Sequence, residues 1–124
     1  IKRCTKGGCV MKDCLFCRIA RGEIPCDKVF ENECLLAFRD ISPQADKHVL
    51  IIPKLHMASL NDLSEAPDAL LAGLLRAAQA VARAEGIQDS GYRLVSNCGP
   101  DARQSVSHLH FHVLGGRQLS ERMV

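Results

Sequence analysis

The hydrophobic positions between residues 64 and 86 repeat with the period of an α-helix. Leucine, alanine and valine side chains recur every three or four residues and form one stripe along this segment. The stripe consists of Leu70, Leu74, Ala77, Ala78 and Val81. Ser64 has the chemistry of an N-cap, Pro67 fits a first turn, and Gly86 fits a C-terminal stop. The pattern therefore predicts one long helix near the middle of the chain.

Shorter apolar segments flank this helix and have the length of strands. They cover residues 28–31, 34–39, 48–53, 92–96 and 106–114. A turn at 31–33 separates the first two, and a short helix is expected over 14–21 because Leu15 and Ile19 share a face. This order predicts an α+β domain with a five-stranded antiparallel sheet, one long helix and one short helix.

Length and charge narrow the function classes. A chain of 124 residues suits one domain, and a net charge of +2 disfavours nucleic-acid polymers and membrane surfaces as partners. The longest strongly apolar run, 49–52, has the length of a strand and not of a membrane span. Met11 resembles a natural start. We therefore expect residues 1–10 to be an N-terminal extension, vector-derived or upstream sequence, and residues 11–124 to form the domain.

Seven cysteines do not fit a fully paired disulfide framework, because their number is odd. The sequence lacks a basic segment followed by an apolar run, which is the pattern that indicates export. We therefore expect reduced thiols and a cytoplasmic location.

Three of the five histidines, His108, His110 and His112, occupy alternate positions. In a strand they share one face about 6.5–7 Å apart, while the residues between them face the core. They could form a solvated strand face or a metal site of their own. The third interpretation is catalysis, in which one imidazole attacks phosphorus and its neighbours position it or the substrate.

The connection 97–105 before the histidines is long and polar, which is typical of functional loops. Gly99 permits close approach of backbone to a ligand. Side chains with hydrogen-bonding capacity follow, and we expect them to hold a single phosphate. They are Asn97, Arg103, Gln104 and Ser105.

The run HLHFHVL matches the His-φ-His-φ-His-φ-φ signature of the histidine triad (HIT) superfamily. The chain resembles this family over about residues 14–119, including CLFCRIARGEIP, LLAFRDISPQADKHVLIIPKLH and QSVSHLHFHVLGGR. The segment HVLGGRQ is similar to the Hint branch, the purine nucleoside phosphoramidases. The resemblance implies a homodimer in which two sheets join into ten strands.

The resemblance also implies hydrolysis of nucleoside 5′-monophosphate conjugates, of the AMP-amine or acyl-AMP type, without a catalytic cofactor. His110 would be the nucleophile that forms a covalent nucleotidyl-histidine, and the backbone carbonyl of His108 would orient its ring. His112 and Ser105 would contact the phosphate and help protonate the leaving group. The purine nucleotide would be held at the ribose by Asp40 and Ile41, at the base by Phe16, Ile19 and Phe38, and at the phosphate by Asn97, Arg103, Gln104 and Ser105.

Two other functions are compatible with these residues. One is hydrolysis of dinucleoside polyphosphates, and the other is a nucleotide-binding or zinc-stabilised interaction module without turnover. Three features depart from the Hint pattern: Arg103 stands where glycine is usual, Ser107 replaces a common aromatic residue, and the C-terminus lacks a Trp-Pro-Pro tail.

Cys14 and Cys17 form a CxxC motif, which suits zinc when two further N or S ligands complete a tetrahedron. Both could also be buried small residues. If the strand that begins at His48 lies beside the histidine strand, His48 and His108 could reach the cysteines. The sequence thus predicts a structural zinc ion held by Cys14, Cys17, His48 and His108, with His56 as a hydrogen-bonded turn residue.

Overall fold

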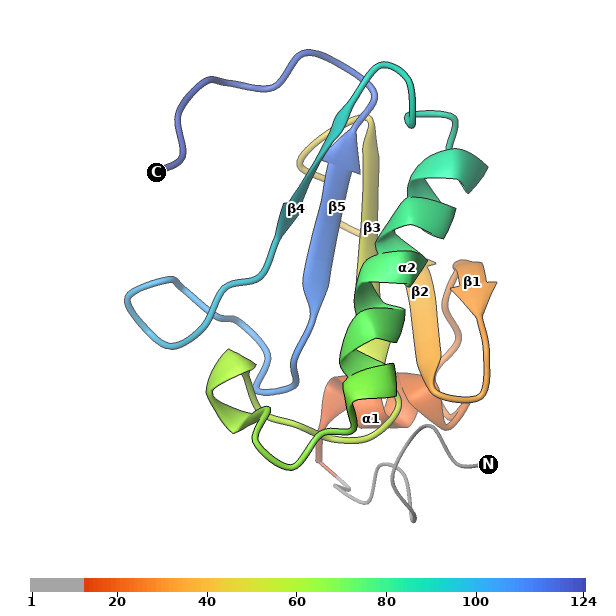
Figure 1. The fold of residues 1–124 in the computed structure, drawn as a ribbon, viewed down its shortest axis with the longest axis vertical. Helices are drawn as coiled ribbons and strands as arrows, with labels where there is room; N and C mark the ends of the chain where they lie inside the picture. Colours follow the sequence, from red (N-terminus) through yellow and green to blue (C-terminus); the bar gives the residue numbers. More distant parts are fainter. Residues whose placement is uncertain (1–12) are drawn as a thin grey trace.

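Five antiparallel strands form one sheet in the computed structural model, which describes residues 13–124. The strand order is β1-β2-β3-β5-β4, and Figure 1 shows α2 lying in front of this sheet. The elements are α1 (Leu15–Ala20), β1 (Lys28–Glu31), β2 (Leu35–Arg39), β3 (Lys47–Pro53), the 3₁₀ helix η1 (Leu60–Asp62), α2 (Asp68–Ala84), β4 (Tyr92–Val95) and β5 (Phe111–Gly115). The predicted α+β class is confirmed, whereas residues 1–10 and Met11 lie outside the described range.

β2 and β3 are apolar on both faces, because each face of these strands is covered by a helix. On β2, Leu35 and Ala37 pack in the cluster beneath α2, whereas Leu36 and Phe38 pack in a second cluster with Phe16 of α1. Side chains alternate between faces along a strand, so one segment supplies both clusters. Fully burying one leucine or isoleucine contributes about 1.5–3 kcal/mol, so these strands anchor the fold.

The long helix begins later than its sequence pattern suggests. Pro67 is the N-cap with φ −65° and ψ 145°, and Ser64 lies in the preceding turn, so the predicted Ser64 cap is wrong. The backbone is extended at Pro67, so helical geometry starts only at Asp68. At the other end the prediction is confirmed, because Gly86 follows the C-cap with φ +75°, a conformation glycine adopts without strain. The predicted apolar stripe is buried.

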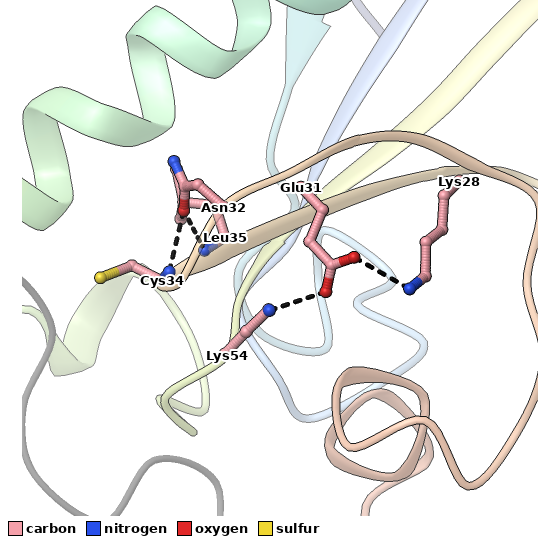
Figure 2. A network of polar contacts seen from close by, with 6 residues as sticks. All are labelled: Lys28, Glu31, Asn32, Cys34, Leu35 and Lys54. Carbon is pink, nitrogen blue, oxygen red and sulfur yellow. Dashed lines mark hydrogen bonds and ion pairs between the residues drawn. The ribbon is translucent and has the colours of Figure 1, made fainter.

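Side-chain contacts fix the connection between β1 and β2 (Figure 2). The Oδ1 atom of Asn32 accepts hydrogen bonds from the backbone N–H groups of Cys34 and Leu35, each at 2.8 Å. Glu31 contacts the ammonium groups of Lys28 at 2.8 Å and Lys54 at 2.7 Å, and together they lower its pKa to about 2. The predicted turn is therefore present, and the strand after it begins one residue late, at Leu35.

The last strand is shorter than the expected 106–114. It begins at Phe111 because the preceding backbone is bonded elsewhere: His108 N–H donates to Val106 O at 2.8 Å and Leu109 N–H to Met57 O at 2.6 Å. The predicted alternation nevertheless holds. Leu109 and Val113 are buried in the cluster beneath α2, so the histidines between them face the α1 side of the sheet.

Within residues 13–124, no helix has the length and hydropathy needed to cross a bilayer.

Candidate active site and metal centre

A pocket of about 330 Å³ lies between α1 and the sheet face that carries the histidines. That volume is within the range of small-molecule sites. Its apolar wall is built by Phe16, Ile19 and Phe38, and Phe16 meets Phe38 edge to face with ring centroids 5.7 Å apart. Its remaining lining includes Asp40, Ile41, Ser105, His110 and His112. The structure thus brings eight predicted site residues around one cavity.

His110 presents an unprotonated ring nitrogen to this pocket. Its Nδ1 lies 2.7 Å from the backbone carbonyl oxygen of His108, and a carbonyl can only accept, so Nδ1 carries the proton. Nε2 of the neutral ring therefore keeps its lone pair. The ring is 3% exposed and packs against the edge of Phe16 at a centroid distance of 5.1 Å. The hydroxyl of Ser96 donates to the carbonyl oxygen of His110 at 2.8 Å and holds its backbone in place.

A series of hydrogen bonds gives His112 the tautomer opposite to that of His110, with the proton on Nε2. The backbone N–H of Gln44 donates to Nδ1 of His48 at 3.0 Å, so neutral His48 carries its proton on Nε2. That Nε2 lies 2.8 Å from Nδ1 of His112 and 3.5 Å from a carboxylate oxygen of Asp40. Nδ1 of His112 is thus an acceptor, and its Nε2–H is a donor.

Burial keeps the rings of His112 and His48 uncharged at neutral pH. Burial, with a smaller effect of the neighbouring His110 and His48, lowers the pKa of His112 to about 4. Burial also lowers the pKa of His48, although the Asp40 carboxylate partly offsets this effect. His110 and His112 therefore offer one lone pair and one N–H, which suits attack on a phosphorus centre together with hydrogen bonding to its oxygens.

Fewer residues of the loop 97–105 line the pocket than predicted. Asn97, Arg103 and Gln104 are not among the residues that line the pocket. The amide of Gln104 accepts from Gly99 N–H at 2.9 Å and donates to the carbonyl oxygens of Ala58 at 2.7 Å and Val106 at 3.0 Å. These backbone groups occupy the Gln104 amide, and its contact with a phosphate stays a prediction. Gln104 holds the loop that carries Ser105.

Arg103 is exposed and adopts φ +62°, the only positive φ of a non-glycine residue in the described range 13–124. A side chain destabilises this left-handed conformation, which glycine adopts freely. This conformation explains why glycine is usual at this position of the Hint pattern.

Four potential metal ligands lie close together, and one of them is the first histidine of the HLHFHVL run. They are Cys14, Cys17, His56 and His108. Nδ1 of His108 lies 3.3 Å from Sγ of Cys14, 3.6 Å from Sγ of Cys17 and 3.2 Å from Nδ1 of His56, and the Cys17–His56 distance is 3.3 Å. In a tetrahedral zinc site two nitrogens lie about 3.3 Å apart, and nitrogen and sulfur about 3.6 Å. These four distances therefore match edges of a zinc tetrahedron, and all four ligand atoms lie within 4.8 Å of one another.

The tautomer of His108 supports the same conclusion. Its Nε2 donates to the carbonyl oxygen of Pro53 at 2.8 Å, so Nδ1 points a lone pair at the cluster. The ring is fully buried, and burial lowers its pKa to about 4, which favours the neutral form that binds metal.

The predicted fourth ligand, His48, does not join this cluster. Antiparallel pairing places His48 opposite Leu114 and Ile51 opposite Phe111. Residues earlier than Phe111 therefore lie toward the far end of β3 and beyond it, where His56 is found. His48 instead contacts Asp40 and His112, so the structure groups His56, and not the predicted His48, with the two cysteines and His108.

The cysteines depart from the expectation of reduced thiols. Cys14, Cys26 and Cys98 are free, whereas Cys17 and Cys34 each belong to a disulfide bond. An odd total leaves one thiol over but does not prevent the others from pairing. Coordination of zinc by Cys17 needs its thiolate, so it requires reduced protein.

Two residues of these sites were missed by sequence reasoning. His56 was taken for a turn residue, although extending the β3–β5 register past Pro53 would have placed it near His108. Ser96 ends a predicted strand, and no sequence signal distinguishes its hydroxyl from that of an ordinary edge residue.

This chain is similar to known proteins in both sequence and structure. The profile of the family described as "HIT domain" matches residues 21–119. The purine nucleoside phosphoramidase of Escherichia coli is 43% identical over 108 residues, covering 87% of this chain and 91% of that protein. A 14 kDa zinc-binding protein of Zea mays is 48% identical over 108 residues, covering 86% and 84%. A crystal structure of a HIT family hydrolase from Legionella pneumophila superposes with a TM-score of 0.85 at 52% identity, covering 88% and 97%.

Proposed function

This chain belongs to the HIT domain family, and from its site we propose that it is a nucleotide phosphoramidase. It cleaves conjugates of nucleoside 5′-monophosphates, of the AMP-amine or acyl-AMP type, through a nucleotidyl-histidine on His110. The observation that carries this proposal is the pairing of ring nitrogens in one pocket. Nε2 of His110 has a lone pair, and Nε2 of His112 has a proton.

The nucleotide lies with its base against Phe16, Ile19 and Phe38 and with its phosphate at the two histidines. Asp40 and Ile41 stand at the ribose between them. An aromatic and aliphatic wall suits a purine, because it offers apolar surface for a flat ring to pack against. Asn97, Arg103 and Ser105 belong to the loop beside the phosphate, and of these only Ser105 lines the pocket.

In the first step, Nε2 of His110 forms a bond to phosphorus while the P–N bond to the amine breaks. The bound phosphate anion raises the pKa of His112 from its low value, so that His112 takes up a proton and gives it to the departing amine. With His112 charged, Nε2–H of His48 can turn to the Asp40 carboxylate 3.5 Å away. Water then attacks phosphorus, the bond to His110 breaks, and His112 takes the proton of the water.

We also propose that Cys14, Cys17, His56 and His108 hold a structural zinc ion, which supports the backbone carbonyl that orients His110. The distances among their ligand atoms and the tautomer of His108 support this assignment. A structural zinc ion supplies folding free energy and no chemical step. His108 is then a positioning residue for His110.

The experiment that tests the function is release of amine from adenosine 5′-phosphoramidate by wild type and by His110→Ala. We expect turnover by the wild type and none by the variant, with AMP binding retained in both. Two inert proteins that still bind AMP would favour the non-catalytic module. Faster cleavage of a dinucleoside polyphosphate than of the phosphoramidate would favour the polyphosphate hydrolase.

A further inference from the structure

The tautomers of His48 and His112 depend on a backbone group that does not line the pocket. The N–H of Gln44 donates to Nδ1 of His48 at 3.0 Å, and Nε2 of His48 lies 2.8 Å from Nδ1 of His112. In a neutral imidazole, the nitrogen that accepts a hydrogen bond leaves the proton to the other nitrogen. The position of the Gln44 N–H group therefore decides whether His112 presents an N–H or a lone pair to the phosphate.

Gln44 lies in the loop 40–46, which joins β2 to β3 and has no regular secondary structure. Two local hydrogen bonds shape the loop: Ser42 N–H donates to Oδ1 of Asp40 at 2.8 Å, and the side-chain amide of Gln44 donates to Ser42 O at 3.2 Å. Ala45 is buried and holds the part of the loop that follows Gln44. The local bonds join the loop to itself, so they do not fix its place over the histidines.

Arg117 attaches this loop to the segment that follows β5. Its Nη2 donates to the backbone carbonyl oxygen of Gln44 at 2.8 Å, and its Nη1 lies 3.4 Å from Oδ1 of Asp46. One planar guanidinium thus contacts the loop at two points, on either side of Ala45. Because the carbonyl that it binds belongs to Gln44 itself, the guanidinium limits how far the Gln44 N–H group can move from His48.

The turn before Arg117 has no room for a side chain. Gly116 has φ +92°, and a Cβ atom at this position would lie 2.8 Å from Cβ of Asp46 and 3.2 Å from the backbone nitrogen of Lys47. Glycine permits both the positive φ and the close approach of the two segments. The contact between Arg117 and the loop is therefore supported by a second, independent feature of the backbone.

We propose that Arg117 is a positioning residue for His112. It acts through Gln44 and His48: its guanidinium keeps the Gln44 N–H group on Nδ1 of His48, which keeps the proton of His112 on Nε2. Without Arg117, both rings can exchange to the other tautomer. Nε2 of His112 then has a lone pair, which repels the phosphate oxygens where an N–H would bind them.

The loss of Arg117 has a partial effect, because two other groups act in the same direction. The carboxylate of Asp40, 3.5 Å from Nε2 of His48, also favours a proton on that nitrogen, and buried Ala45 still holds the loop. The inference rests on the proposed phosphoramidase function for its effect on rate, whereas its effect on the tautomers can be measured without turnover.

Nitrogen-15 spectroscopy reads the tautomers directly, because the protonated and unprotonated nitrogens of a neutral imidazole have well separated shifts. In the wild type we expect both His48 and His112 to be protonated at Nε2 alone. In Arg117→Ala the two nitrogen shifts of each ring should move toward each other, as exchange between tautomers requires. Arg117→Lys, which keeps a donor for the carbonyl, should lie between the two. Arg122→Ala, which removes an exposed arginine of the same C-terminal segment, is the matched control and should match the wild type.

Kinetics test the consequence for the reaction. With adenosine 5′-phosphoramidate, Arg117→Ala should lower kcat about threefold, the size of one net hydrogen bond, and keep KM within about twofold. Arg117→Lys should recover part of the loss, and Arg122→Ala should lose nothing. Gly116→Ala, which pushes the turn away from Asp46, breaks the same contact by another route and should change shifts and kcat in the same direction.

Unchanged nitrogen shifts in Arg117→Ala, or altered shifts with the kcat of the wild type, would overturn the proposal. If the wild type does not cleave the phosphoramidate but Arg117→Ala alters the shifts, the phosphoramidase function fails and the control of the tautomers by Arg117 stands. If the wild type cleaves it and Arg117→Ala keeps both shifts and kcat, the positioning role fails alone.

Discussion

Nδ1 of His110 lies 2.7 Å from the backbone carbonyl oxygen of His108. Because the acceptor is backbone, the tautomer of His110 does not depend on the side chain of His108. That side chain acts on position instead, through Pro53 and the cysteine–histidine cluster. The orientation and the position of the His110 ring are thus set by separate groups, which substitutions can distinguish.

Replacing His48 should slow the chemical step more than it weakens binding. In His48→Ala the hydrogen bond at 2.8 Å to Nδ1 of His112 is lost, so the tautomer of His112 is no longer fixed. We expect kcat for adenosine 5′-phosphoramidate to fall about tenfold or more, with KM within a factor of about three. His48→Gln, which keeps an N–H donor, should recover part of the loss. Equal kcat for wild type and His48→Ala would refute this role.

Zinc content should distinguish His56 from His48. With reduced protein, we expect wild type and His48→Ala to bind about one zinc ion per chain, and His56→Ala and Cys14→Ser to bind much less. Elemental analysis of protein purified under reducing conditions provides the measurement. Loss of zinc from His48→Ala with retention in His56→Ala would restore the assignment based on sequence.

Acid should destabilise the fold through His112. Its pKa is about 4 in the folded protein and about 6.5 in the unfolded chain, so between these values the unfolded state binds more protons. Stability is therefore highest above about pH 6.5 and falls as the pH drops toward 4. For this partly exposed ring we expect a loss of about 1–2 kcal/mol. Urea unfolding at several pH values should show a smaller slope for His112→Asn, and an unchanged slope would contradict the assignment.

Arg103→Gly should stabilise the protein. The residue has φ +62°, so glycine relieves a strain of about 1–2 kcal/mol and gives back part of it as greater chain entropy in the unfolded state. We expect a net gain of about 0.5 kcal/mol in the free energy of unfolding, measured by urea denaturation. Arg103→Lys, which keeps the charge and the strain, serves as the control. A loss of stability in Arg103→Gly would show that the side chain makes a compensating contact.

The sequence predicted the parts of this molecule that depend on local periodicity. The α2 stripe, the strand segments and the alternation of histidines with Leu109 and Val113 follow from side-chain spacing alone. Assignments that depended on pairing between strands were less successful. His48 was assigned to the cysteines because the β3–β5 register is not a local property. The bond of the Gln104 amide to Ala58, in a distant segment, was not foreseen for a similar reason.

Detection of the covalent intermediate tests the central claim most directly. Wild-type protein is mixed with adenosine 5′-phosphoramidate, quenched in alkali, which preserves a P–N bond to histidine, and digested for mass spectrometry. The account predicts an AMP adduct on His110 during turnover, none on His112, and none in His110→Ala. Turnover without an adduct on His110, or with the adduct on another residue, would contradict it.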